Sequence, residues 1–266
     1  MKKLSTEEVK KIQLEILDVV ASFCEENGIN YWIDCGTLLG AIRHKGYIPW
    51  DDDIDIGMLR QDYDRFRELF NQKNDLYRFV CYENNPNFYV PFGKVCDMRT
   101  VLYEPDENGY KLNINIDIFV YDNAPDDDIE LKEMFDTRDR LRKIHAIQNY
   151  NIPTTGSKIK FLLRHIRKLA YLLFLPHITM RNMIENSKKY ADKDTERVGN
   201  FTSYARNSCN KIVFNSFVDV EFEGKAYKAP IGYDEWLRSF YGNYMELPPE
   251  NERVTHHSYK AFVVQD

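Results

Sequence analysis

The chain of 266 residues is 43% hydrophobic and 14% aromatic, so it can bury the core of one large domain or of a domain with an appended lobe. Its formal net charge of −6 and the lack of a long basic block argue against nucleic acid as a partner. The five cysteines are widely spaced and form no C-x-x-C pair, which favours reduced thiols and a cytoplasmic location over a disulfide framework or a zinc site.

The N-terminal part is predicted to open with a long helix. Ser5 and Glu8 can form a capping box, and Gly28 ends the helix after apolar residues at helical spacing. Three short elements are then predicted in order: a strand over Ile29–Asp34, a helix over Thr37–Arg43 and a strand over Asp53–Met58.

The rest of the chain is predicted to form a block of strands followed by a block rich in helices. After a helix over Asp62–Phe70, strands are predicted over Phe79–Tyr82, Tyr89–Val95, Val101–Glu104 and Lys111–Val120. Later helices are predicted over Ile129–Gln148, Lys158–Leu175, Thr179–Asp192 and Tyr233–Tyr241, with a hairpin of Phe217–Phe222 and Lys225–Ala229. The pattern indicates an α/β (α+β) fold with a mixed-sheet core over residues 1–124. Residues 125–266 would form a helical lobe and a C-terminal segment.

The stretch Asp34–Met58 contains a dense acidic run, with carboxylates at Asp51, Asp52, Asp53 and Asp55. If this run is extended, Asp51, Asp53 and Asp55 share one face, because alternate residues of a strand point the same way. Crowded carboxylates repel unless a cation lies among them, and hard oxygen ligands suit Mg²⁺ or Mn²⁺. Runs of Asp are more often solvated loops, but apolar residues bracket this one on both sides.

A third carboxylate is predicted to come from the strand Lys111–Val120. One face of that strand is apolar, whereas Asp117 lies on the other face as a lone acid among apolar neighbours. A buried unpaired carboxylate is costly, so a nearby cation would compensate it. The candidate metal ligands are therefore Asp53, Asp55 and Asp117. The alternative is that Asp117 pairs with a Lys or Arg in the core.

Donor phosphates would need backbone N–H groups and cations. Gly36 and Thr37 stand between a strand end and a helix start, where backbone amides can cradle a phosphate. Arg43 and Lys94 are candidate phosphate-binding cations, although each could instead form a surface salt bridge. A second acidic run, Asp126–Asp128, stands where a helix begins and is interpreted as a cap rather than a second metal site.

The predicted helix Lys158–Leu175 is both basic and apolar. Such a helix can lie on an anionic membrane surface, giving peripheral contact at the inner face of the cytoplasmic membrane, or it can pack into the helical lobe. Both alternatives fit the pattern.

The run G-T-L-L-G-A-I-R-H-K-G-Y-I-P-W-D-D-D-I-D-I-G resembles the signature of the LicD family, as do N-I-D-I-F at Asn115–Phe119 and Y-G-N-Y-M-E-L-P-P at Tyr241–Pro249. This family contains bacterial phosphocholine transferases and, more distantly, fukutin and fukutin-related protein. The resemblance implies a nucleotidyltransferase-like fold and metal-assisted transfer of phosphocholine from CDP-choline to a sugar hydroxyl, with release of CMP. It implies that Asp51, Asp53, Asp55 and Asp117 are metal ligands or catalytic acids and bases. Lys94 matches a basic position of the family.

The acceptor implied by the resemblance is a lipid-linked oligosaccharide or a teichoic acid precursor. Aromatic residues near the motifs could hold the quaternary ammonium of choline, namely Trp50, Tyr82, Tyr89, Phe92 and Tyr103. Two rival hypotheses remain. In the first, the enzyme transfers ribitol phosphate, another polyol phosphate or a nucleotide on the same fold. In the second, the protein is an inactive scaffold that binds glycans.

Overall fold

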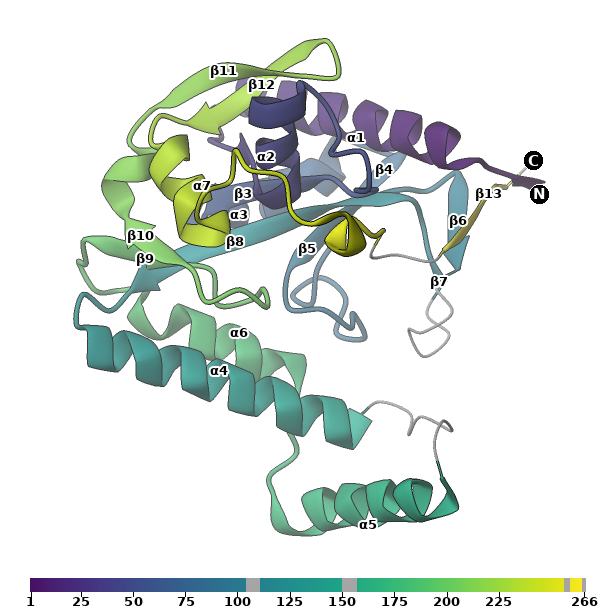
Figure 1. The fold of residues 1–266 in the computed structure, drawn as a ribbon, viewed down its shortest axis with the longest axis vertical. Coiled ribbons are helices and arrows are strands. Elements are labelled where there is room, and N and C mark those ends of the chain that lie inside the picture. The colour runs from purple at the N-terminus through teal and green to yellow at the C-terminus, as the bar shows by residue number, and fades with distance from the viewer. Residues whose placement is uncertain (104–110, 150–156, 256–258, 265–266) are drawn as a thin grey trace.

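A computed structural model describes residues 1–103, 111–149, 157–255 and 259–264 (Figure 1). Within these residues a seven-stranded mixed sheet forms the centre of the fold, and with the helices around it this confirms the predicted α/β class. The order β10-β9-β8-β3-β2 is extended by β5, which pairs with β8, and by β4, which pairs with β5. The strands are β2 (Trp32–Ile33), β3 (Asp55–Leu59), β4 (Tyr77–Val80), β5 (Gly93–Asp97), β8 (Asn115–Ala124), β9 (Arg197–Gly199) and β10 (Ser208–Asn210).

Strand β8 is the organising element of this sheet. It pairs in parallel with β3 and antiparallel with β5 and β9, so three segments distant in sequence meet along it. Its apolar face is buried as predicted, with Ile116, Ile118 and Val120 at most 2% exposed. The predicted strand Lys111–Val120 is interrupted, because the Ile114 backbone N–H donates to the Thr100 hydroxyl instead of continuing one ladder.

A second sheet brings the two ends of the chain together (Figure 1). Its order is β1 (Lys2–Lys3), β13 (Lys260–Val263), β6 (Thr100–Tyr103) and β7 (Lys111–Leu112). The predicted hairpin is confirmed as β11 (Phe217–Phe222) and β12 (Lys225–Pro230). Its turn residues Glu223 and Gly224 have φ of 51° and 76°, the positive values that a tight two-residue hairpin turn requires.

Four helices pack around the central sheet: α1 (Thr6–Asn27), α2 (Cys35–His44), α3 (Arg60–Leu69) and α7 (Tyr233–Tyr241). The predicted capping box of α1 is confirmed, since the Glu8 N–H donates to Ser5 Oγ at 3.2 Å and the Ser5 N–H donates to Glu8 Oε2 at 2.8 Å. Gly28 ends the helix with a φ of 58°, in the left-handed region.

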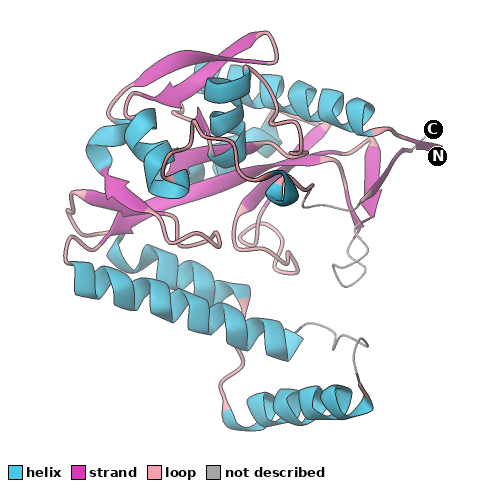
Figure 2. Ribbon diagram, in the orientation of Figure 1, coloured by secondary structure: helices cyan, strands magenta, loops and turns pink. Residues whose placement is uncertain are grey.

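The helical lobe lies below the sheet in Figures 1 and 2 and contains α4 (Asp128–Asn149), α5 (Lys158–Phe174) and α6 (Met180–Ser187). Asp127 accepts hydrogen bonds from the Ile129 and Glu130 N–H groups at 2.9 and 3.0 Å, which confirms the cap interpretation of this acidic run. Short 3₁₀ turns cover Phe70–Gln72, Lys188–Tyr190, Lys211–Phe214 and Glu250–Glu252.

The main apolar core contains residues from both sides of residue 124. Ile16 of α1, Ile56 of β3 and Ile118 of β8 belong to it, together with Trp236 and Leu237 of α7. A smaller core under α4 includes Phe135 and Phe201. Among the described residues, no helix combines the length and the apolarity needed to cross a bilayer.

Candidate active site

The central parallel pair of strands places two of the predicted acids side by side. Asp55 and Asp117 are directly opposite each other in the register of β3 and β8. Asp55 is only 8% exposed, and the Asp117 side chain is 16% exposed. Asp53 lies just before β3 and lines the same cavity as these two residues. The three predicted metal ligands are therefore gathered at one place.

The predicted strand boundary in the acidic run was wrong. Strand β3 begins at Asp55, so Asp51 and Asp53 lie in the irregular segment before it and not on one strand face. The Asp51 carboxylate of this segment lies against Gly36 at the start of α2. Asp51 still contacts the acids, since its carboxylate is hydrogen-bonded with Asp53. Asp52 lines a smaller cavity, which shares Asp53, Lys94 and Asp117 with the large one.

Residues at the start of α2 hold the backbone of Asp55 through hydrogen bonds. Thr37 Oγ1 accepts a hydrogen bond from the Asp55 N–H at 2.9 Å, and the Asp34 N–H donates to the Asp55 carbonyl at 2.9 Å. A Cβ atom at Gly36 would collide with the Asp51 carboxylate, so only glycine permits this close approach. Neither Gly36 nor Thr37 lines the large cavity, whereas Cys35 does.

Burial and mutual repulsion raise the pKa values of these acids. The pKa of Asp55 is raised well above its usual range by burial and by the charges of Asp53, Asp117 and Asp51. The pKa of Asp51 is raised to about 8 by burial and by Asp53 and Asp52. Burial and the neighbouring carboxylates therefore both disfavour the ionised form of these two acids.

Lys94 on β5 partly compensates this charge. Its Nζ lies 2.5 Å from Asp117 Oδ1 and 3.1 Å from Asn115 Oδ1. The alternative left open by the sequence, in which Asp117 pairs with a lysine, is thus the arrangement observed. Because Lys94 also lines the cavity, it can contact a bound anion there.

Arg43 does not reach this cavity. Its Nη1 donates to the carbonyls of Tyr244 and Glu246 at 2.8 and 3.2 Å, and therefore ties the end of α2 to the segment after α7. Burial lowers the pKa of Arg43. The side chain belongs to the packing of the C-terminal segment and not to the walls of the acidic site.

The cavity in front of the acids has a volume of about 610 Å³ and lies between the sheet and the helical lobe. The sheet side supplies the acids, Lys94 and the aromatic side chains of Tyr89, Phe92 and Phe119. The lobe side supplies Arg142, Lys143 and His145 of α4 and the loop Thr202–Tyr204. The acidic wall thus faces a wall that carries Arg142 and Lys143 together with Asp139.

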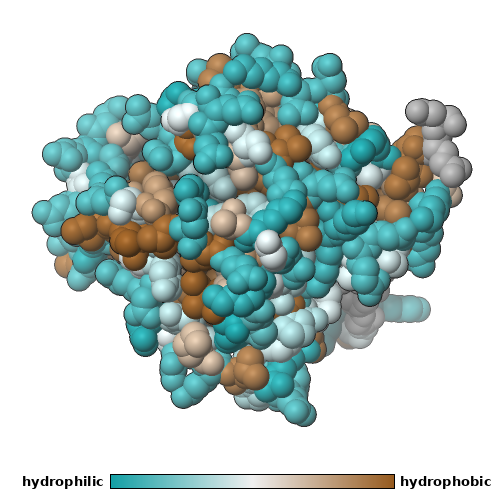
Figure 3. All heavy atoms as spheres, turned by 90° about the horizontal axis from the view of Figure 1, so that it is seen from above, coloured by the Kyte–Doolittle hydropathy of each residue, from teal (hydrophilic) through white to brown (hydrophobic). Residues whose placement is uncertain are grey.

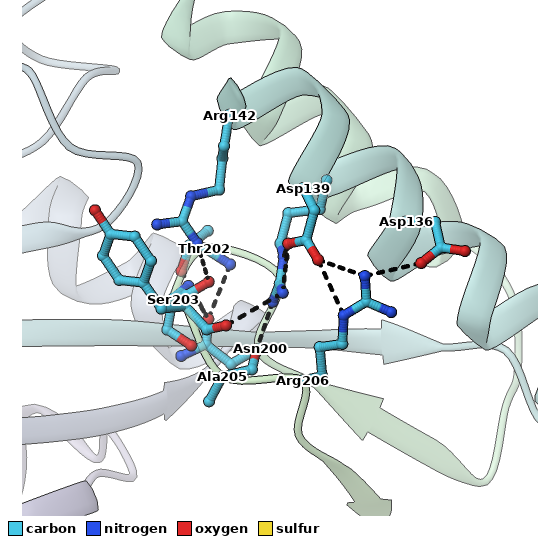
Figure 4. Close-up of polar contacts among 10 residues, drawn as sticks. Asp136, Asp139, Arg142, Asn200, Thr202, Ser203, Ala205 and Arg206 are labelled. Atoms are coloured by element: carbon cyan, nitrogen blue, oxygen red, sulfur yellow. Dashed lines mark hydrogen bonds and ion pairs between the residues drawn. The ribbon is translucent and has the colours of Figure 1, made fainter. Parts of the chain in front are cut away.

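The loop that follows β9 is fixed to α4 by a network of arginines and carboxylates (Figure 4). The Arg138 guanidinium, only 1% exposed, donates to the Ala205 carbonyl at 2.6 Å and to Asp139 at 2.7 Å. Arg142 donates to the Ser203 carbonyl at 2.9 Å and stacks over the Tyr204 ring at 3.4 Å. This network therefore positions the lobe side of the cavity.

Sequence reasoning missed Asp34, which is fully buried next to the acids. It accepts hydrogen bonds from the Tyr121 hydroxyl and, at 2.9 Å, from Trp236 Nε1. Burial raises its pKa, and these two hydrogen bonds oppose the rise. The next residue, Cys35, has a φ of 46°, which is unusual outside glycine and typical of strained functional sites. The sequence signal that could have identified Asp34 is its position as an acid at the end of a predicted strand.

The residues present suit a divalent cation, although no set of three His, Cys, Asp or Glu groups among the described residues already stands in a ligating arrangement. Asp117 is paired with Lys94 in this arrangement. Oxygen donors of Asp53, Asp55 and Asp117 match the preference of Mg²⁺ and Mn²⁺, and all three residues line one cavity.

Divalent cations assist catalysis in phosphatases, polymerases and nucleases, and the clustered acids of this site are of the type that can hold such a cation. Residues 28–141 match the family model described as LicD/FKTN/FKRP, nucleotidyltransferase domain. The chain is also 31% identical, over 99% of its own length and the full length of the relative, to the lipopolysaccharide cholinephosphotransferase LicD of Haemophilus influenzae. The chain belongs to the LicD family, as the sequence resemblance predicted, and it is an enzyme of the phosphotransferase class.

Shorter similarities extend to eukaryotic proteins. The ribitol 5-phosphate transferase FKRP of Homo sapiens is 42% identical over 50 residues, which are 19% of this chain and 10% of that protein. The ribitol-5-phosphate transferase FKTN of Mus musculus is 37% identical over 115 residues, which are 43% of this chain and 22% of that protein.

Proposed function

We propose that this enzyme transfers phosphocholine from CDP-choline to a sugar hydroxyl of a cell-surface glycan, such as a lipid-linked oligosaccharide or a teichoic acid precursor, and releases CMP. The observation that carries the proposal is the convergence of Asp53, Asp55 and Asp117 on a cavity that also holds Lys94. Full-length similarity to a lipopolysaccharide cholinephosphotransferase supports the choline donor.

In this reaction the sugar oxygen forms a bond to the phosphorus that carries choline, and the bond from that phosphorus to the bridging oxygen of CMP breaks. The hydroxyl proton passes to a carboxylate of the acidic cluster. Lys94 would balance charge on the transferred phosphate.

A divalent cation held by Asp53, Asp55 and Asp117 would supply Lewis-acid stabilisation of the phosphoryl oxygens. Thr37 keeps Asp55 in place through its hydrogen bond to the Asp55 N–H. Arg142 and Lys143 on the opposite wall can bind the remaining phosphate charge of the donor.

The choline group is proposed to lie against the aromatic part of the cavity. Of the five aromatics named from the sequence, Tyr89 and Phe92 line it, and Phe119 joins them with its ring 4.8 Å from that of Phe92. Trp50, Tyr82 and Tyr103 are not among its lining residues. Aromatic faces attract quaternary ammonium groups.

The test measures CMP release from CDP-choline with a sugar acceptor, with Mg²⁺ or Mn²⁺ and with a chelator. Asp55→Asn and Asp117→Asn should each lose about a thousandfold in rate, because a metal clamp contributes several kcal/mol to the transition state. Asp75→Asn, at an exposed site outside the cluster, is the matched control. Unchanged rates in both cluster variants would refute the proposed site.

CDP-ribitol is the second donor to test, since the similarity to FKRP favours it. A preference for CDP-ribitol would keep the site and change the substrate. Lack of turnover with either donor, together with no binding of Mg²⁺ or Mn²⁺, would favour an inactive glycan-binding scaffold.

A further inference from the structure

We propose that α5 is a docking surface for an anionic lipid bilayer. The inference starts from the orientation of the helix, which is the reverse of that expected in a water-soluble lobe. Ile159, Leu162, Ile166, Leu169 and Leu173 form one stripe at helical spacing, and each is at least 55% exposed. An amphipathic helix of a globular protein normally turns such a stripe toward the core.

The opposite side of α5 faces the rest of the lobe. Arg164, Lys168 and Tyr171 recur at helical spacing and are half-buried, whereas the apolar stripe is exposed. The helix is held to α4 by Gln148, whose Nε2 donates to the carbonyls of Tyr171 and Pro176 at 3.1 and 3.0 Å. The apolar stripe is therefore held outward by the way α5 is attached.

The charge of α5 indicates which partner would bind the apolar stripe. Its 17 residues include five Lys or Arg and no Asp or Glu, in a chain with a net charge of −6. Lys158, Lys160 and Arg167 are exposed. A second copy packed on this stripe would bring ten like charges together, whereas an anionic bilayer offers both an apolar interior and opposite charge.

The position of α5 in the molecule agrees with this occupant. It projects from the end of the protein farthest from the hairpin β11–β12 (Figure 1). The hairpin end, seen from above in Figure 3, is mainly hydrophilic, with apolar residues in separate groups. A bilayer bound at α5 would lie on the lobe side of the molecule, the side that also forms one wall of the cavity.

The experiment is flotation of the full chain with vesicles of phosphatidylcholine alone and of phosphatidylcholine mixed equally with phosphatidylglycerol. The chain should bind only the anionic vesicles, and added salt should weaken binding. The double variant Lys158→Glu with Arg167→Glu should bind at least about twentyfold more weakly, because each cation near an anionic surface contributes about fivefold. The double variant Leu162→Ser with Leu169→Ser should lose at least about tenfold through lost apolar burial.

Two control variants separate this surface from general effects. Ile129→Ser removes a similarly exposed apolar residue of α4, and Lys11→Glu reverses an exposed charge of α1; both should bind as the parent does. All variants should keep the parent melting temperature and the parent rate on a soluble acceptor. The assay contains no donor, so its failure would leave the proposed transfer reaction untouched.

Equal binding to neutral and anionic vesicles, or equal binding by the parent and both α5 variants, would overturn the proposal. The proposal would also be overturned if the chain did not bind vesicles but formed a dimer that the leucine variant dissociates. The stripe would then be an interface between copies.

Discussion

Replacing Asp51 with Asn should stabilise the protein and at the same time impair transfer. The Asp51 carboxyl is half-buried beside Asp53, and its pKa is raised to about 8. In the unfolded chain the same group ionises near pH 3.9. As pH rises from about 4 to 8, the unfolded state therefore gives up its proton first, and the folded state loses stability relative to it.

The magnitude follows from the same pKa difference. A pH of 7 is about three units above the pKa of Asp51 in the unfolded chain. Keeping this carboxyl protonated in the folded state therefore lowers the free energy of unfolding by at most about 4 kcal/mol. Because Asn reproduces only part of the hydrogen bonding of a protonated Asp51, we expect the Asn variant to recover about 1–2 kcal/mol of this. For a chain of this size that is a rise of roughly 3–6 °C in Tm.

Thermal melting followed by circular dichroism, in a chelator at pH 5, 7 and 8, measures this effect. The difference in Tm between Asp51→Asn and the parent should grow with pH, whereas Asp75→Asn should show none. Saturating Mg²⁺ should shrink the difference, because a cation compensates the charge in the parent. A variant that melts below the parent at pH 7 in chelator would show that repulsion among these acids is not what limits stability.

Three further predictions concern the supports of the site. Gly36→Ala should displace the Asp51 carboxylate and lower kcat at least about tenfold with little change in KM, as steady-state kinetics will show; an unchanged kcat would mean that the close approach is not needed. Trp236→Phe should lower the free energy of unfolding by about 1–3 kcal/mol in urea titrations, because buried Asp34 loses a donor; a neutral result would contradict the structural role of that hydrogen bond. Arg142→Met should raise KM for the donor severalfold and leave Tm within about 2 °C, whereas Arg140→Met on the same helix should change neither; equal effects would assign Arg142 a general role.

Local signals in the sequence predicted much of the fold. The capping box at Ser5 and Glu8, the turn at Glu223 and Gly224 and the alternation in β8 are each encoded within a few residues, so their patterns predict the structure directly. The gathering of Asp55 and Asp117 also followed, because each acid interrupts an apolar strand pattern.

The features that were missed depend on partners distant in sequence. Strands β9, β10 and β13 have only three or four residues each, too few to show a period, and they exist because neighbouring edges are available for pairing. The role of Asp34 depends on Tyr121 and Trp236, which local patterns cannot connect to it. The contacts of Arg43 could not be foreseen for the same reason, since its partners are the carbonyls of Tyr244 and Glu246.

The transfer reaction depends on the correct parallel register of β3 and β8. A slip of β8 by a single residue would put Ile116 or Ile118 opposite Asp55, point Asp117 to the other side of the sheet and expose an isoleucine to the cavity. Such a misfolded chain would hold almost all of its secondary structure and still be inactive. Catalytic turnover therefore reports on strand alignment that spectroscopic measures of helix and strand content would not detect.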